Sequence, residues 1–165
     1  MLDEDGKFYI IEMGYRLPGD MTFIPYMEMF NFDVTKWLVD YALGIKKPIS
    51  EMPNDQTGAY EKCGCCYSLW THKEGTIAKI SGIEELLNNK GFGYYSLNQV
   101  GSHIPVHRPV GVFTFTSNDI EGMIEKIKLI NNTISVIDTD NEDIIIRYTD
   151  FHNLRTIYYN GLKGL

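Results

Sequence analysis

The stretch Gly111-Val112-Phe113-Thr114-Phe115-Thr116 sets the pattern for the larger part of this chain. It is a short run of apolar and β-branched residues, which is typical of a buried β-strand. Ser117 and Asn118 follow it, and such residues often start helices because their side chains accept hydrogen bonds from unpaired N–H groups. The residues that follow place apolar side chains on one helical stripe, formed by Ile120, Met123, Ile124, Ile127 and Ile130. The stretch therefore predicts a strand followed directly by an amphipathic helix.

The surrounding segments repeat this mixture of strands and helices. Further strands are predicted for Tyr60 to Trp70, Gly75 to Ile80, Phe92 to Leu97, Ile134 to Ile137 and Ile144 to Tyr148. Residues 71–74 are expected to join the first two of these strands as a hairpin loop. Ser81-Gly82-Ile83-Glu84 has the form of a capping box, which predicts a short helix through Leu87 that Gly91 ends. Strands interleaved with two capped helices indicate an α+β fold.

The N-terminal part has a different organisation. A buried strand is predicted for Lys7 to Met13, a short helix for Met21 to Phe32, and a second helix for Val34 to Leu43. Asp33 is expected to cap the second helix and Gly44 to end it. Residues 45–58 contain two prolines and a glycine, which makes them the best candidate for a boundary. We therefore expect two units, residues 1–45 and residues 46–165.

Charge and composition exclude several classes of protein. The chain of 165 residues has 15 basic and 22 acidic side chains, a formal charge of −7. Proteins that bind nucleic acid usually carry a basic face, so no nucleic-acid partner is expected. No run of eighteen apolar residues is present, so no membrane partner is expected either. Three cysteines within four residues do not form a disulfide framework, and a cytoplasmic location is expected.

One acidic residue lies within the first predicted strand. Strand alternation places Ile10, Glu12 and Gly14 on one face, with Arg16 following at the same parity. A carboxylate in a buried strand is costly unless it is paired or binds a cation. Glu12 and Arg16 could form a structural ion pair. Alternatively they could form a cation and phosphate site, because carboxylates suit magnesium and guanidinium groups suit phosphate.

The segment Phe8 to Arg16 resembles the late metal-binding strand of the ATP-grasp superfamily. The resemblance is closest to biotin carboxylase, carbamoyl-phosphate synthase and ATP-dependent amino-acid ligases, in which Glu, any residue, Asn, any residue and Arg follow one another. The loop Leu17-Pro18-Gly19-Asp20 and the helix ending in Ala42-Leu43-Gly44 resemble the amino-acid ligase branch. Residues 75–85 and 110–117 resemble the C-terminal domain of that branch. The resemblance implies the end of an ATP-grasp domain, followed by a small domain of mixed β-sheet and helices.

The resemblance also implies roles for four residues. Glu12 matches the carboxylate that bridges magnesium to the phosphates of ATP, and is thus a metal and cofactor ligand. Arg16 matches the catalytic arginine that steadies the phosphoryl oxygens and the acyl-phosphate. Gly19 and Asp20 would shape the loop that borders the acceptor substrate. The chain departs from the pattern at Gly14, where the family usually has an Asn metal ligand.

Other parts of the family's nucleotide site have no counterpart in the sequence. By the family's spacing, a further metal carboxylate, the phosphate-binding lysines and the glycine-rich loop would all precede Met1. We therefore expect a C-terminal fragment of an ATP-dependent carboxylate ligase, inactive alone and without bound ATP or magnesium. Its expected partners are the missing N-terminal part of the ligase and further copies of itself in a homo-oligomer. A non-catalytic dimerisation or docking module is the alternative.

Three further clusters, of cysteines, histidines and acidic residues, are candidate sites. Cys63 and Cys66 have the spacing of one half of a zinc site, but no second pair follows, and small hydrophobic strand residues are the preferred interpretation. His103 and His107 flank Pro105 and are expected in a solvated loop. The acidic run 138–143 does not match a calcium-binding loop. It predicts a solvated hairpin turn.

Overall fold

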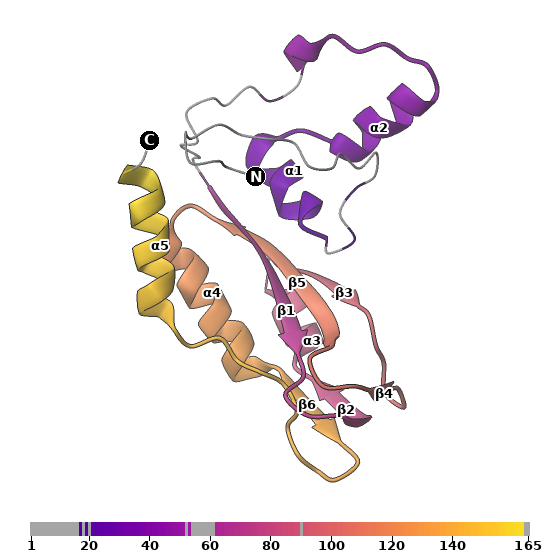
Figure 1. Cartoon of the computed structure of the whole chain (residues 1–165), viewed down its shortest axis with the longest axis vertical. Coiled ribbons are helices and arrows are strands. Elements are labelled where there is room, and N and C mark those ends of the chain that lie inside the picture. The colour runs from indigo at the N-terminus through magenta and orange to yellow at the C-terminus, as the bar shows by residue number, and fades with distance from the viewer. Residues whose placement is uncertain are drawn as a thin grey trace, which may run out of the picture.

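The computed structural model describes residues 17, 19, 21–51, 53, 62–89 and 91–163. Within them the chain forms an α+β arrangement of five α-helices, one 3-10 turn and two small antiparallel sheets (Figure 1). The helices are α1 (Phe23–Phe30), α2 (Val34–Ala42), α3 (Ile83–Asn88), α4 (Ile120–Thr133) and α5 (Phe151–Lys163), with the 3-10 turn η1 at Ile49–Glu51. The strands are β1 (Cys63–Trp70), β2 (Gly75–Ser81), β3 (Gly93–Ser96), β4 (His103–Ile104), β5 (Pro109–Ser117) and β6 (Ser135–Asp138).

The strand β5 forms the middle of the larger sheet, which has the order β1-β5-β3. Every residue of β5 between its two ends is buried, as a near-continuous apolar run predicts. Tyr67 of β1 faces Phe113 across one ladder, and Tyr95 of β3 faces Val112 across the other. The predicted strand from Gly111 to Thr116 is thus confirmed, with two more residues at its start and one at its end.

The chain neighbours β1 and β2 lie in different sheets, so the predicted hairpin between them is wrong. The strand β2 pairs instead with β4 and β6 in the smaller sheet. The connection is fixed by Thr71, whose buried hydroxyl donates to the carbonyl oxygen of Pro105 at 2.9 Å. Its N–H donates to the carbonyl oxygen of Arg108 at 3.1 Å. These hydrogen bonds to residues distant in the sequence direct the chain after Thr71 into the second sheet. No hairpin therefore joins β1 and β2.

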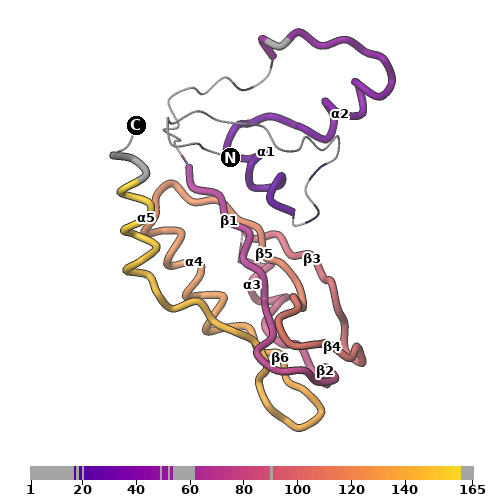
Figure 2. Tube along the Cα trace, in the orientation of Figure 1, coloured from indigo at the N-terminus to yellow at the C-terminus, as the bar shows by residue number. Residues whose placement is uncertain are grey.

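Helix α4 carries the stripe that the sequence predicts. Its buried residues are Ile120, Met123, Ile124, Ile127 and Ile130. Its N-cap is Asp119, whose Oδ1 accepts a hydrogen bond from the N–H of Gly122 at 2.7 Å. The prediction that Ser117 and Asn118 provide the cap is therefore wrong by one residue. In Figure 2, α4 and α5 lie side by side along the sheet that contains β1 and β5.

The predicted capping box before α3 does not form. Ser81 is the last residue of β2, and Gly82 precedes the helix with φ at +90° and no side-chain cap. A Cβ atom on Gly82 would lie 2.2 Å from the carbonyl oxygen of Thr133. The close packing of Gly82 against the end of α4 thus determines where α3 begins, and no side-chain cap is involved.

The segment after β6 is not the predicted strand from Ile144 to Tyr148. Ile144 and Ile145 are buried, but the β-pairing of the segment with other described residues is limited to isolated bridges, from Ile145 to Thr71 and from Asp143 to Ile137. The chain then continues into α5, which the sequence pattern did not predict. Burial, which strands and buried coil share, explains Ile144 and Ile145, whereas Ile146 and Tyr148 are exposed.

The N-terminal helices agree with expectation. The carboxylate of Asp33 accepts from the N–H of Lys36 at 2.8 Å, which confirms the cap of α2, and Gly44 has a φ of +76°. Helix α1 packs on β1 and β5. Gly64 allows this approach, since a Cβ atom there would lie 2.5 Å from the Sδ atom of Met29. The predicted strand from Lys7 to Met13 lies outside the described residues. Among the described helices, none is long and apolar enough to cross a membrane.

Candidate functional site

Three of the four predicted site residues lie outside the described part of the chain. These are Glu12 and Arg16, predicted to bind metal and phosphate, and Asp20 of the predicted substrate loop. Gly19 is described and is exposed in a turn. Within the described ranges, no group of three or more His, Cys, Asp or Glu side chains is placed to hold a metal ion. The ATP and magnesium roles therefore stay predictions.

The cysteines lie on β1. None forms a disulfide, and Cys63 is buried while Cys65 and Cys66 are partly buried. Burial raises the pKa of the Cys65 thiol to about 12, with a smaller contribution from the neighbouring Cys66. Strand alternation points Cys65 and Cys66 toward opposite faces. The three cysteines therefore lie on a strand as small, at least partly buried residues. This agrees with the interpretation preferred from the sequence.

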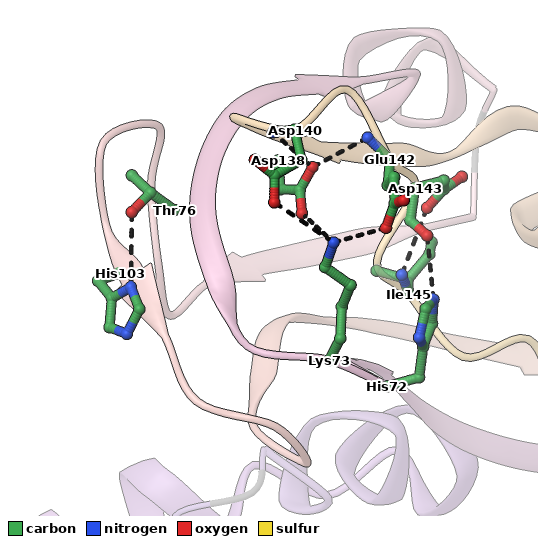
Figure 3. Close-up of polar contacts among 9 residues, drawn as sticks. All are labelled: His72, Lys73, Thr76, His103, Asp138, Asp140, Glu142, Asp143 and Ile145. Atoms are coloured by element: carbon green, nitrogen blue, oxygen red, sulfur yellow. Dashed lines mark hydrogen bonds and ion pairs between the residues drawn. The ribbon is translucent and has the colours of Figure 1, made fainter.

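The two histidines of the 103–107 segment do not form one site. His103 belongs to β4, and its Nδ1 lies 3.5 Å from the Oγ1 of Thr76 (Figure 3). His107 adopts a positive φ of 55° in a turn. Both residues are exposed, as expected for a solvated segment.

The acidic run that follows Ile137 is organised by one lysine (Figure 3). The Nζ of Lys73 lies 2.8 Å from Asp138 Oδ2, 2.5 Å from Glu142 Oε2 and 3.7 Å from Asp140 Oδ2. The other oxygen of Asp138 accepts from the N–H groups of Asp140 and Glu142 at 3.0 and 2.9 Å. A turn is thus present, but no second strand follows it in the described part of the chain, and its first carboxylate is buried, with a side-chain exposure of 1%.

The charges of this turn shift each other's pKa. The hydrogen bond from Lys73 is the main cause that lowers the pKa of Asp138, and the N–H of Glu142 adds to it. The same pairing raises the pKa of Lys73. Asp138 and Lys73 are both charged near neutral pH, and their ion pair compensates the two charges. The cluster is therefore a structural clamp between β6 and the residues that precede β2.

A groove lies along β1. It has a volume of about 720 Å³. One wall is β1, from Cys65 to Ser68 with Trp70, and the other is the segment Ile146 to Asp150. Apolar side chains of the two long helices also line it, namely Met123, Ile127 and Leu154.

A hydrogen-bond network holds the second wall in place. The hydroxyl of Tyr67 donates to Asn131 Oδ1 at 2.6 Å and accepts from the N–H of Tyr148 at 2.9 Å. The Nδ2 of Asn131 donates to the carbonyl oxygen of Tyr148 at 2.8 Å. Burial raises the pKa of Tyr67. The phenol therefore remains a neutral donor that fixes the distance between the two walls.

Arg147 anchors the start of the same wall. Its Nε donates to the carbonyl oxygen of Asn131 at 2.9 Å, and Nη2 donates to that of Ile134 at 3.0 Å. The same Nη2 lies 2.5 Å from the carboxylate of Asp143. The guanidinium is thus committed to the fold, and it does not offer a charge to a ligand.

The sequence analysis did not identify this groove or the residues that shape it. Tyr67 and Tyr148 are 81 positions apart, and Tyr67 and Asn131 are 64 positions apart. No local pattern marks such pairs. The only signal in the sequence is a polar residue, Asn131, in the last turn of an otherwise apolar helical stripe.

Comparison with known proteins gives one structural match. No family model and no curated protein sequence matches the chain. The crystal structure of L-amino acid ligase from Bacillus licheniformis is similar over 84% of this chain, with a TM-score of 0.65 and 20% sequence identity. The match covers 34% of the ligase, so this chain spans about a third of that protein's length. In fold, the chain is therefore similar to part of an L-amino acid ligase, as its sequence resemblance to amino-acid ligases predicts.

Proposed function

We propose that the chain forms the C-terminal part of an ATP-dependent carboxylate–amine ligase. The observation that supports this most is the similarity in fold to part of an L-amino acid ligase over 84% of the chain. Because the match covers only a third of that ligase, the remainder of such an enzyme would supply the nucleotide site. The proposed reaction joins a carboxylate, activated as an acyl-phosphate, to an amine or a similar nucleophile.

Two residues would meet the nucleotide in this proposal. Glu12 would bind magnesium, because hard divalent cations prefer carboxylate oxygens. Arg16 would hold phosphoryl oxygens through its planar fork of N–H donors. Gly19 and Asp20 would border the acceptor substrate. ATP, when bound, would supply the phosphoryl group that activates the carboxylate. The support for these roles is the sequence resemblance of residues 8–16.

The decisive experiment uses the longest in-frame coding sequence that contains these residues. Amino-acid-dependent release of phosphate from ATP is expected from its product. Glu12→Gln should lower turnover about a hundredfold or more, the scale of losing one electrostatic stabiliser. Arg16→Lys should also lower turnover, because lysine lacks the planar fork of N–H donors. Glu51→Gln, an exposed substitution in η1, serves as the matched control and should leave turnover unchanged.

A structural ion pair between Glu12 and Arg16 would give a different result. Each single change would then lower the melting temperature, and the double change to Gln and Met would restore much of it with activity intact. Normal turnover of Glu12→Gln contradicts the metal-site role.

The second candidate function is a non-catalytic docking module. Gly14 favours it, because it removes a metal ligand of the family pattern. The groove along β1 also favours it, since a concave surface lined largely by apolar side chains suits binding. Under both proposals the present chain alone has no micromolar affinity for ATP with magnesium. Absence of ATP-dependent activity in the longest coding sequence would select the docking module.

A further inference from the structure

Helix α1 packs on one cross-strand pair of the larger sheet. Gly64 of β1 and Thr116 of β5 are direct partners in the antiparallel ladder. A Cβ atom on Gly64 would lie 2.5 Å from the Sδ atom of Met29 and 3.1 Å from the Cβ atom of Pro25, so glycine leaves room for α1 here. On the facing strand, the hydroxyl of Thr116 donates to Glu28 Oε1 at 2.5 Å. The Gly64–Thr116 pair thus determines where α1 lies on the sheet.

The Thr116 half of this pair is part of the packed core. Thr116 is buried, and its carbonyl oxygen accepts a hydrogen bond from the Nζ of Lys126 on α4 at 2.9 Å. The same ammonium group lies over the rings of Phe92 and Phe115, at 5.2 and 5.8 Å from their centroids. Helix α1 has eight residues, and a helix of that length is not stable without packing. The sheet therefore supplies the stability of α1.

The chain enters α1 through a residue in the left-handed conformation. Met21 has a φ of 65°, which is uncommon for a residue other than glycine. Its carbonyl oxygen accepts from the N–H of Ile24, in the first turn of α1, at 3.1 Å. Such a conformation persists only where the surrounding contacts hold it. The direction of the chain just before α1, where Gly19 lies in an exposed turn, is therefore coupled to the position of α1 on the sheet.

We propose that Thr116 is a positioning residue for the acceptor-substrate loop of the ligase, a role that rests on the function proposed above. In that function, Gly19 and Asp20 border the acceptor. Thr116 acts through Glu28 and α1, which hold the end of this loop at Met21. A loop that must be ordered on binding lowers affinity, because the ordering costs free energy. The KM for the acceptor therefore depends on a hydroxyl group of the larger sheet.

The kinetic test measures phosphate release from ATP by the longest in-frame coding sequence. The substrates are the pair of common amino acids that gives the highest wild-type rate. Thr116→Val keeps the shape of the side chain but removes the hydroxyl. It should raise the KM for the acceptor about fivefold, and leave kcat and the KM for ATP within about a factor of two of wild type. Thr116→Ser keeps the hydroxyl and should restore the wild-type KM.

Thr114→Val is the matched control. Thr114 is also buried on β5, and its side chain lies toward β3, since a Cβ atom on Gly93 would lie 2.6 Å from its Oγ1. The control therefore removes a hydroxyl from the same strand without removing a hydrogen bond to α1. It should leave all three kinetic parameters unchanged.

Hydrogen exchange in the present chain tests the structural part of the proposal without catalysis. Thr116→Val should speed exchange of the α1 amides about fivefold, because losing a stabilising hydrogen bond raises the population of the open helix. Thr114→Val and Thr116→Ser should leave this exchange unchanged. If Thr116→Val does not fold, Glu28→Met removes the same hydrogen bond from its exposed side and should produce both effects.

The outcomes separate this role from the ligase function itself. An inactive wild-type enzyme would refute the ligase function, and the role of Thr116 with it. An active wild-type enzyme whose KM for the acceptor is unchanged by Thr116→Val would refute the positioning role alone. Unchanged exchange in α1 would refute it as well. So would equal increases in the KM for ATP and for the acceptor, which indicate a general loss of structure.

Discussion

The carboxylate of Glu28 accepts a hydrogen bond from the hydroxyl of Thr116 at 2.5 Å, which joins α1 to the middle strand of the larger sheet. The two residues are 88 positions apart. The carbonyl oxygen of Thr116 also accepts from the Nζ of Lys126 at 2.9 Å, so strand, α1 and α4 meet at this residue. The N-terminal helix is therefore tied to the C-terminal part by a specific polar contact as well as by packing.

The first prediction concerns the strength of this contact. Thr116→Val and Glu28→Met are expected to show a coupling energy of about 1 kcal/mol in a double-mutant cycle, because each change removes the hydrogen bond to a carboxylate at a partly buried site. Urea unfolding of the wild-type chain, both single variants and the double variant gives the value. Strict additivity would mean that this hydrogen bond does not contribute to stability in solution.

The second prediction concerns pH and the clamp between Lys73 and Asp138. The pKa of Asp138 is lowered in the folded state, so its contribution to stability is present above the ordinary pKa of 3.8 and is lost as pH falls through the lowered value. The pKa of Lys73 is raised, so its contribution is lost only at pH above the ordinary value of 10.5. Asp138→Asn should lower the melting temperature at pH 7 and flatten its decline below pH 4. Asp140→Asn, at an exposed position, should change neither. A wild-type decline that Asp138→Asn leaves intact would refute the assignment.

The third prediction compares two glycines with nearly the same backbone conformation. Gly82 and Gly101 have φ values of 90° and 89°. A Cβ atom on Gly101 meets nothing within 4 Å, whereas one on Gly82 meets the carbonyl oxygen of Thr133. Gly101→Ala should thus cost about 1 kcal/mol of unfolding free energy from backbone strain alone. Gly82→Ala should cost about 2 kcal/mol more, because backbone atoms must shift. Equal losses in chemical denaturation would contradict the close approach of α3 and α4.

The fourth prediction concerns thiol reactivity. A pKa of about 12 leaves very little Cys65 thiolate at pH 8, and the thiolate is the reactive form. Alkylation of Cys65 by iodoacetamide is therefore expected to be on the order of a hundredfold slower than that of free cysteine. The Cys63→Ser, Cys66→Ser variant isolates this thiol for mass spectrometry, and alkylation in urea controls for reagent quality. Rapid modification of the folded variant would show that β1 opens readily.

The fifth prediction concerns self-association through α2. This helix has no fully buried residue, and Val39, Tyr41 and Leu43 are 53%, 66% and 71% exposed. A nine-residue helix is marginal unless its apolar side chains are covered. Sedimentation at rising concentration should show association that Leu43→Glu weakens. Ile157→Glu is the control, since it changes an equally prominent apolar residue on α5, 61% exposed, and it should leave association intact. A chain that stays monomeric at high concentration would contradict this role for α2.

Local chemistry in the sequence determined several features of this protein by itself. The apolar stripe of α4, the central strand β5 and the Asp33 cap depend on residues within a few positions of one another, so spacing alone predicts them. The amino-acid ligase resemblance also came from short segments, and the fold agrees with it. By contrast, the structure alone decided the separate sheets of β1 and β2, the burial of Asp138 and the groove beside β1. These depend on contacts such as Thr71 with Pro105 and Tyr67 with Tyr148, whose partners are distant in the sequence. Local propensities are similar for many strand pairings, and only burial and hydrogen bonding across the whole chain select one of them.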